Sequence, residues 1–163
     1  MNKLMVLCVE DEAEVREAIM RDLDPFKSII QLEAADNSED ALAVLNECKA
    51  DGIAAALVLC DHLMPGLRGV DFLIQLQADP RYAATRKVLI TGQAGLEDTV
   101  RAVNEARLHH YIAKPWDPEQ LAQVVRDQLT EYVLETQSDL MPYVSSLDGP
   151  RLLEKIAAGP RDE

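Results

Sequence analysis

Residues 56–69 read ALVLCDHLMPGLRG, and the character of this segment changes at Asp61. The residues before Asp61 form an unbroken apolar run of strand length, which is typical of a strand buried on both faces of a parallel sheet. Pro65, Gly66 and Gly69 then indicate a loop before the next helix. Open α/β sheets carry their chemistry at the carboxyl ends of their strands, so Asp61 is predicted to belong to a functional site.

Apolar segments of strand length alternate with helical patterns on both sides of this segment. Strands are predicted at residues 4–9, 29–35, 54–60, 87–91 and 110–113. Helices are predicted at residues 13–23, from Asn37 or Ser38 to Asp51, at 70–77, at 96–103, and from Pro118, capped by Asp117, to about Leu134. In the fourth helix, Leu96, Val100 and Val103 mark the apolar side and the outer face is polar. The alternation predicts an α/β fold with a doubly wound, five-stranded parallel sheet and helices on both faces.

The alternation ends near Leu134, but apolar residues continue beyond it. They include Leu140, Met141, Tyr143, Val144 and Leu147, and a short final helix is predicted at residues 151–158. We therefore expect a domain at residues 1–134 and a helical C-terminal extension at residues 135–163. Its apolar residues either fold back on the domain or form a contact surface for a partner or a second copy, as in a homodimer. In the second case, removal of the residues after Gln137 changes the oligomeric state.

The composition excludes several classes of function. The chain has 163 residues, 48% of them hydrophobic, and a formal net charge of −13, which argues against direct nucleic-acid binding and against attraction to anionic lipid. No signal peptide is predicted at the N-terminus, and no apolar stretch is long enough to span a membrane. Cys8, Cys48 and Cys60 are isolated and predict buried thiols rather than disulfides or a metal site. We expect a cytoplasmic protein.

Functional groups follow four of the predicted strands. Glu10 and Asp11 follow the first strand, Asp61 the third, Thr91 ends the fourth, and Lys114 follows the fifth. The carboxyl ends of parallel strands lie along one edge of a sheet, so these residues are expected to converge. Three adjacent carboxylates repel one another, and a hard divalent cation such as Mg²⁺ relieves the repulsion while also accepting a phosphate oxygen. With the Lys114 charge and the Thr91 hydroxyl, such a site would stabilise a phosphoryl group.

These residues, in this order, resemble the receiver domain of two-component response regulators, which has a flavodoxin-like fold. The residues that carry the resemblance, over about residues 3–134, are Glu10-Asp11, Asp61, Met64-Pro65-Gly66, Gly69, Thr91-Gly92, Tyr111 and Lys114-Pro115. The resemblance implies that Asp61 accepts a phosphoryl group from the phosphohistidine of a sensor histidine kinase or phosphotransfer protein. The chain would then be a signalling domain rather than an enzyme that acts on separate substrates.

The resemblance also implies a ligand set for the cation, which would be Mg²⁺ or Mn²⁺. Asp11 and Asp61 would bind it directly, Glu10 through a water molecule, and Leu63 through its backbone carbonyl. No organic cofactor is implied. Leu63 and Gln93 occupy positions that tune the lifetime of the phosphoryl group in the family, and the apolar Leu63 cannot itself orient a hydrolytic water.

A conformational switch is implied as well. Lys114 would pair with the phosphoryl group, Thr91 would move to bond it, and Tyr111 would follow inward. The face made by the fourth helix, fifth strand and fifth helix would then change towards a downstream target that the sequence does not identify. The Lys114–Pro115 peptide bond is expected to be cis. Trp116 differs from the residue found in many receivers, and no role for it follows from the sequence.

His62 is the residue for which a functional and a structural interpretation compete most directly. It lies next to Asp61 and could serve as a metal ligand or a base. Side-chain alternation points it away from Asp61, so we favour a structural role.

Other functions fit the sequence less well. A phosphatase of the haloacid-dehalogenase type needs a second acid two residues after its nucleophile, where this chain has Leu63. A flavodoxin-like cofactor module needs a phosphate-cradling loop after the first strand, where this chain has Glu10-Asp11-Glu12. A receiver that no longer accepts phosphate is disfavoured because no key residue is missing. No effector segment follows, so we expect a stand-alone receiver or the front of a longer protein.

Overall fold

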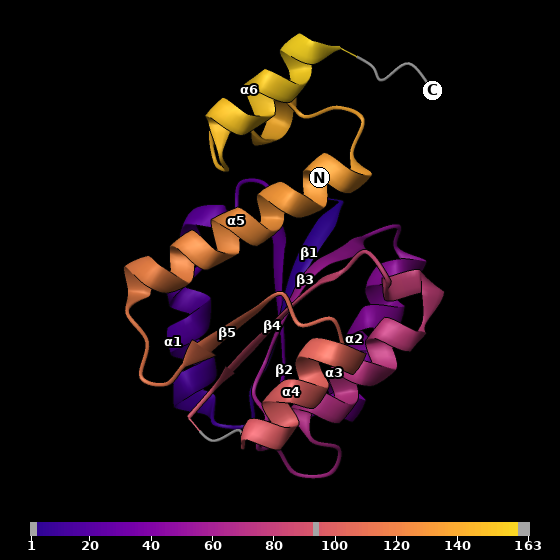
Figure 1. Ribbon diagram of the computed structural model, residues 1–163, viewed down its shortest axis with the longest axis vertical. Helices are drawn as coiled ribbons and strands as arrows, with labels where there is room; N and C mark the ends of the chain where they lie inside the picture. The colour runs from indigo at the N-terminus through magenta and orange to yellow at the C-terminus, as the bar shows by residue number, and fades with distance from the viewer. Residues whose placement is uncertain (1–2, 93–94, 160–163) are drawn as a thin grey trace.

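The computed structural model describes residues 3–92 and 95–159, and a five-stranded sheet forms its centre (Figure 1). The strands are β1 (Leu4–Val9), β2 (Gln31–Ala35), β3 (Ala54–Cys60), β4 (Arg86–Thr91) and β5 (His110–Ala113). Their order in the sheet is β2-β1-β3-β4-β5, and every neighbouring pair is parallel. The predicted doubly wound parallel sheet is confirmed.

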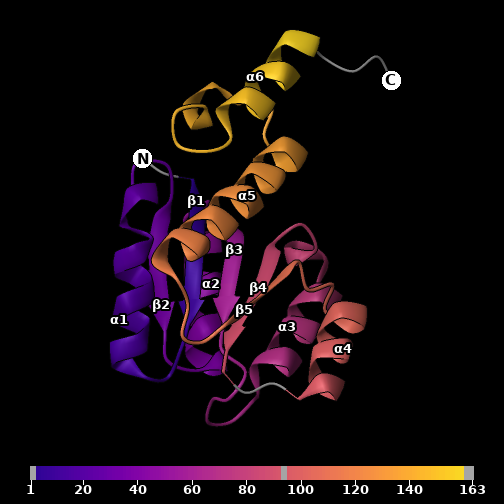
Figure 2. The same cartoon turned by 60° about the vertical axis from the view of Figure 1, so that its left-hand side comes forward.

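Helices cover both faces of this sheet. The helices of the described residues are α1 (Ala13–Asp22), α2 (Ser38–Ala50), α3 (Gly69–Ala78), α4 (Leu96–Glu105), α5 (Pro118–Thr136) and α6 (Gly149–Ala158), with short 3-10 turns η1 (Asp24–Phe26), η2 (Pro80–Tyr82) and η3 (Met141–Tyr143). Helices α1 and α5 lie on one face and α2, α3 and α4 on the other (Figures 1 and 2). Each face has its own apolar core, and β1 is buried along its whole length between the two.

Local sequence signals explain several of the helix starts. The Asn37 side chain accepts a hydrogen bond from the Asp40 N–H at 2.8 Å and caps α2. The Asp117 side chain accepts one from the Glu119 N–H at 2.9 Å and caps α5, with Pro118 in the first helical position. Both caps agree with the predictions from sequence.

Some details differ from the predictions; for example, the final helix begins at Gly149 rather than residue 151. Strand β2 begins at Gln31 rather than residue 29, because the N–H groups of Ile29 and Ile30 both bond to the Phe26 carbonyl in a turn. In α4, Val100 and Val103 are 48% and 53% exposed, so the prediction that they mark the inner side was wrong. Ala102 and Ala106 are fully buried instead. Small alanines let α4 approach its neighbours closely, at the cost of leaving the valines in solvent.

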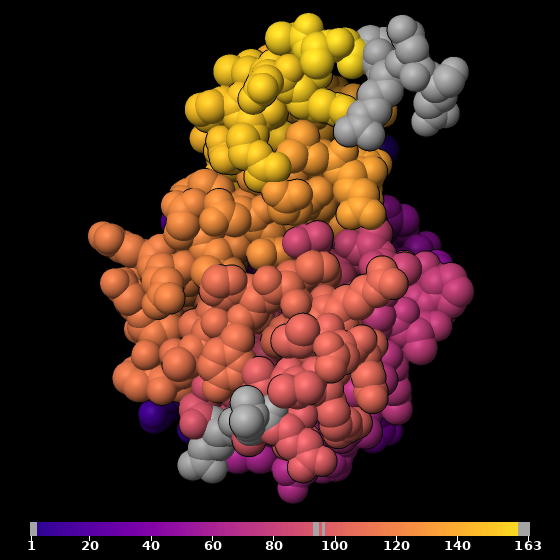
Figure 3. All heavy atoms as spheres, viewed as in Figure 1, coloured from indigo at the N-terminus to yellow at the C-terminus, as the bar shows by residue number. Residues whose placement is uncertain are grey.

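The C-terminal extension folds back onto α5. Leu140, Leu147 and Leu152 are buried in the same core as α1 and α5, which supports the fold-back interpretation of these residues. The extension lies at the end of the molecule opposite the carboxyl ends of the strands (Figures 1 and 2) and stands out as a lobe in Figure 3. The division of the chain near Leu134 stays a prediction, as does a change in oligomeric state on truncation.

Two further observations concern the described residues. None of their helices combines the length and apolar character needed to cross a bilayer. Cys8, Cys48 and Cys60 are free and buried, as the sequence predicted.

Candidate functional site

The carboxyl ends of the central strands lie side by side because these strands are in register. Val9, the last residue of β1, pairs with Cys60, the last residue of β3. The Asp61 N–H extends this pairing and donates to the Val9 carbonyl at 3.0 Å. Glu10 and Asp61, the residues that follow the two strands, are therefore held next to each other by the sheet itself.

Glu10, Asp11 and Asp61 form an acidic cluster at this edge. Each offers a carboxylate oxygen, and these oxygens lie within 4.8 Å of one another. Glu10 is fully buried and Asp61 is 4% exposed, so water screens their charges poorly. All three acids predicted to converge do converge.

Lys114 reaches into the acidic cluster from the loop after β5. Its Nζ donates to both carboxylate oxygens of Glu10, at 3.0 and 3.1 Å, and lies 3.4 Å from Asp61 Oδ2. One ammonium thus contacts two of the three carboxylates in the acidic cluster, and the site keeps an excess of negative charge. The sequence predicted that Lys114 would be here, but not that Glu10 would be its main partner.

The electrostatics of this pair follow from burial and from each other's charge. Burial raises the pKa of Glu10 to about 7; hydrogen bonding to Lys114 opposes the rise and the charge of Asp61 adds to it. Burial alone would lower the pKa of Lys114, but its hydrogen bond to Glu10 and the charges of Glu10 and Asp61 raise it overall. Lys114 is therefore charged at neutral pH, whereas the burial of Glu10 opposes the ionisation of its carboxyl group.

A cavity of about 240 Å³ opens beside the acidic cluster. It is lined by Glu12, Asp61, Leu63, Thr91, Gly92 and Lys114. Thr91 is 1% exposed, and Leu63 is 41% exposed. The acceptor oxygens, a hydroxyl and an ammonium thus border one small open space, large enough for a tetrahedral anion.

Tyr111 lies next to Thr91, as its predicted role as a switch requires. Its hydroxyl donates to the Thr91 backbone carbonyl at 3.2 Å, and the side chain is half-buried. The Lys114–Pro115 bond is cis, as predicted. Movement of Thr91 or Tyr111 stays a prediction.

Glycines shape the loop that follows Asp61. Gly66 has a φ of +80°, a conformation that side chains disfavour. At Gly69 an added Cβ would lie 1.9 Å from the Asp61 carbonyl oxygen, so only glycine allows this close approach. The Gly69 N–H also donates to the His62 carbonyl at 2.9 Å, which closes the loop behind the acidic cluster.

The remaining sequence expectations have mixed outcomes. Trp116, for which no role was predicted, donates from Nε1 to Asp22 at 2.8 Å and so ties the loop before α5 to α1. His62 is buried and its ring contacts Asp98 on α4, so it does not join the acidic cluster, in line with the structural role favoured from sequence. Gln93 lies outside the described residues.

The comparisons with known proteins agree on one family. Residues 6–126 match the family model of the response regulator receiver domain. The chain is 35% identical to the hydrogenase transcriptional regulatory protein HoxA of Cupriavidus necator over 121 residues. This alignment covers 74% of this chain and 23% of HoxA. It is 32% identical over 116 residues to the phosphate regulon transcriptional regulatory protein PhoB of Escherichia coli, covering 71% of this chain and 47% of PhoB. The chain thus spans a quarter to a half of the length of these relatives.

Solved structures give the same fold. The signal receiver domain of an HD domain-containing protein from Pseudomonas fluorescens Pf-5 superposes with a TM-score of 0.73 at 23% identity, covering 85% of this chain and 96% of that one. A CheY-like response regulator receiver domain protein from Methanospirillum hungatei JF-1 superposes with a TM-score of 0.69 at 26% identity, covering 83% of this chain and 99% of that one. Both likenesses span nearly the whole of the known receiver.

Proposed function

The chain belongs to the response regulator receiver domain family of two-component signal transduction, and on that premise we propose that Asp61 accepts a phosphoryl group. The observation that carries the proposal is the contact of Lys114 with both Glu10 and Asp61 at the border of the 240 Å³ cavity. A charged lysine beside a buried nucleophilic carboxylate is what transfer of an anionic group requires.

The proposed reaction is an in-line displacement at phosphorus. The donor is the phosphohistidine of a sensor histidine kinase or of a phosphotransfer protein. An Asp61 carboxylate oxygen forms a bond to phosphorus as the phosphorus–nitrogen bond breaks, and that bond's electron pair stays on the histidine nitrogen. We assign the attack to Oδ2, which faces Lys114, because the main-chain N–H of His62 already donates to Oδ1 at 2.8 Å.

Lys114 and Thr91 have separate roles in this proposal. Lys114 exchanges part of its bonding to Glu10 for an oxygen of the incoming phosphoryl group, which places positive charge where negative charge develops. The Thr91 hydroxyl donates to another phosphoryl oxygen. Both residues line the cavity, so small side-chain movements are sufficient for these bonds.

A divalent cation fits the residues present. Glu10, Asp11 and Asp61 supply hard oxygen ligands within reach of one ion, and their excess negative charge is the donor chemistry that Mg²⁺ or Mn²⁺ prefers. We assign direct contacts to Asp11, Asp61 and the Leu63 carbonyl, and a water-mediated contact to Glu10. A bound cation would neutralise the charge on the phosphoryl oxygens and lower the repulsion met by an anionic donor.

The output is a change of surface. We propose that phosphorylation draws Thr91 towards Asp61 and that Tyr111, bonded to the Thr91 carbonyl, moves with it. The face made by α4, β5 and α5 would change for a downstream partner. Because this chain spans less than half of HoxA and PhoB, their named roles as transcriptional regulators suggest an output for this chain without identifying it.

The test is the intact mass of the protein after incubation with acetyl phosphate and Mg²⁺. We expect one phosphoryl adduct in the wild type and none in Asp61→Asn or after chelation of the metal. Asp71→Asn, which alters an acid on α3 outside the acidic cluster, serves as the matched control and should load normally. An adduct that persists in Asp61→Asn would contradict the proposal. So would the absence of both a phosphoryl and a beryllofluoride adduct in the wild type.

A further inference from the structure

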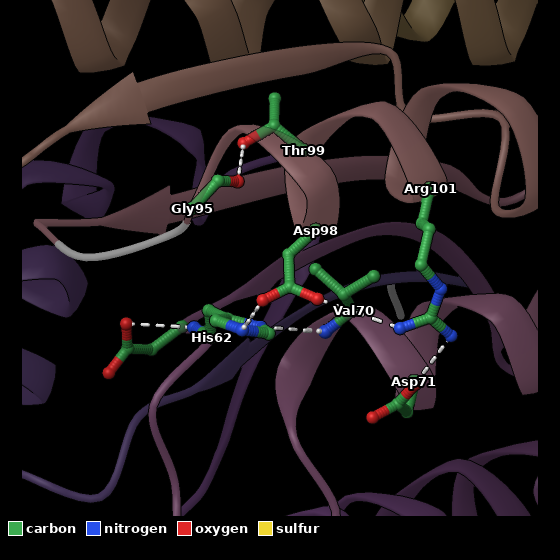
Figure 4. Close-up of polar contacts among 8 residues, drawn as sticks. His62, Val70, Asp71, Gly95, Asp98, Thr99 and Arg101 are labelled. Atoms are coloured by element: carbon green, nitrogen blue, oxygen red, sulfur yellow. Dashed lines mark hydrogen bonds and ion pairs between the residues drawn. The ribbon is translucent and has the colours of Figure 1, made fainter.

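His62 makes three polar contacts with different parts of the molecule, although it belongs to neither the acidic cluster nor the proposed switch. Its main-chain N–H donates to Asp61 Oδ1 at 2.8 Å. Its ring Nδ1 accepts from the Val70 N–H at 3.4 Å, and its Nε2 lies 3.1 Å from Asp98 Oδ2 (Figure 4). The residue is 1% exposed. One buried residue therefore joins the acceptor aspartate through its main chain, and the start of α3 and the first turn of α4 through its ring.

The hydrogen-bond partners determine the form of the ring. A backbone N–H is only a donor, so Nδ1 must accept and carries no hydrogen. Nε2 then carries the hydrogen and donates to Asp98. Both ring nitrogens are satisfied in this single tautomer, which fixes the orientation of the ring.

Among the side chains that the structure describes, few other contacts fix the first half of α4. Of these side chains in α4 and its C-cap, those of Ala102 and Ala106 are buried; they lie towards the end of the helix and contribute little apolar area. Arg101 also bonds Asp71 of α3 at 2.9 Å and lies 3.6 Å from Asp98, but these groups are 31–40% exposed and contribute little. Within the described residues, the His62–Asp98 bond links the first turn of α4 to the loop after Asp61, and it is buried at its His62 end, whereas Asp98 is 31% exposed.

We propose that His62 is a positioning residue that couples the state of Asp61 to α4 through Asp98. The inference rests on the proposed function of Asp61. Phosphorylation at Oδ2 turns Oδ1 from a carboxylate oxygen into the neutral oxygen of an acyl phosphate, so its hydrogen bond with the His62 N–H loses its charge assistance. The His62 main chain can then shift, and its ring carries the shift to Asp98 and α4. This route is separate from the Thr91–Tyr111 route.

The link is tested by amide hydrogen exchange in α4, measured by NMR on the unmodified protein. His62→Leu removes both ring bonds and Asp98→Ala removes the acceptor, while Asp98→Asn keeps an acceptor oxygen. Asp71→Ala is the matched control because it breaks the exposed Arg101 bridge and leaves His62 intact.

We expect amide exchange in α4 to be about fivefold or more faster in His62→Leu and Asp98→Ala than in the wild type, with Asp98→Asn and Asp71→Ala close to the wild type. In the double variant His62→Leu/Asp98→Ala, exchange should be no faster than in either single variant, because both changes remove one interaction. Wild-type exchange in Asp98→Ala would overturn the inference.

The coupling itself is tested with beryllofluoride and Mg²⁺ as the probe. In the wild type, beryllofluoride on Asp61 should change α4 exchange about fivefold or more. His62→Leu and Asp98→Ala should lose most of this change and keep only the part carried by the Thr91–Tyr111 route, while Asp71→Ala should keep all of it. A merely structural role for His62 would not reduce this response. If beryllofluoride binds and the response survives undiminished in both variants, the coupling is wrong and the proposed function stands. If it does not bind the wild type, the proposed function fails and the coupling fails with it.

Discussion

At the carboxyl edge of the sheet Lys114 lies among carboxylates, whereas near the amino edge Lys87 lies among backbone carbonyls. Lys87 is fully buried, and its Nζ donates to the carbonyls of Tyr82 and Thr85 at 3.1 and 2.7 Å. Burial, with the charges of Arg86 and Arg107, lowers the pKa of Lys87 to about 8. The pKa of Lys114 is instead raised overall by its acidic neighbours.

The difference separates a structural charge from a functional one. The bonds of Lys87 go to neutral backbone carbonyls of the fold, and it forms no ion pair with any described residue. Lys114 shares its bonds among more negative charge than it can balance, beside an open cavity. An unbalanced charge that borders a cavity marks the site at which a cation and an anionic group can be bound.

The largest expected effect comes from removing the lysine of the carboxyl edge. Lys114→Ala should slow phosphoryl loading of Asp61 by about 10²–10³-fold, the usual loss for one transition-state donor. Stability should change little, because Glu10 already has a pKa of about 7 and takes up a proton when its partner is lost. Loading rates from acetyl phosphate measure the first effect and denaturant unfolding the second. A rate within threefold of the wild type would contradict the assigned role.

The lysine near the amino edge should behave in the opposite way. Lys87→Ala opens a cavity and removes the ammonium donor from the Tyr82 and Thr85 carbonyls, of which Tyr82 keeps another donor, the Thr85 N–H. It should therefore lower the free energy of unfolding by about 2–4 kcal/mol. The loading rate of the folded protein should not change. Lys87→Met, which keeps most of the volume, separates the cavity from the lost bonds. If Lys87→Ala slowed loading as Lys114→Ala does, the distinction between the edges would fail.

Metal binding provides a further test of the comparison between the two edges of the sheet. A cation that binds only the folded state should raise the free energy of unfolding by about 2.7 kcal/mol at a Mg²⁺ concentration one hundred times Kd. Asp11→Asn removes a ligand and should abolish most of this stabilisation, while Asp71→Asn should retain it. Chemical unfolding at constant ionic strength provides the measurement. Equal stabilisation of all three proteins would place the cation elsewhere.

The smallest effect concerns pH near the amino edge. Burial, then the charges of Arg86 and Lys87, lowers the pKa of His109 from 6.5 to about 4, and its Nδ1 accepts from the Lys87 N–H at 2.9 Å. Between these pH values the unfolded chain binds a proton that the folded chain does not, so stability is lost as pH falls from 6.5 to 4. At pH 5 we expect a loss of about 1 kcal/mol relative to His109→Asn, which keeps an acceptor. Parallel stability curves for the two proteins would refute this.

The convergence of Glu10, Asp61, Thr91 and Lys114 could be predicted because it depends only on strand direction. Once the apolar runs indicated a parallel sheet, the residues after each strand had to share an edge. The bonding of Lys114 to Glu10 could not be predicted in the same way. It depends on the rotamer of a long side chain and on burial that differs among three similar acids.

Other features depend on contacts between distant elements. The ring of His62 contacts Asp98, which lies 36 residues away on α4, and no local sequence pattern indicates such a pair. The orientation of α4 was mispredicted because the pattern gave weight to Val100 and Val103, whereas packing selected Ala102 and Ala106. The extension could be predicted as helical, but its packing on α5 depends on which apolar surfaces the domain leaves uncovered.

The most direct measurement locates the modified residue. Borohydride reduction of the phosphorylated protein converts an aspartyl phosphate to homoserine, which peptide mapping by mass spectrometry can place in the chain. The account predicts homoserine at position 61, formed only when Mg²⁺ and acetyl phosphate were both present, with Glu10 and Asp11 unmodified. Homoserine at position 11, or a label spread over several surface acids, would contradict it.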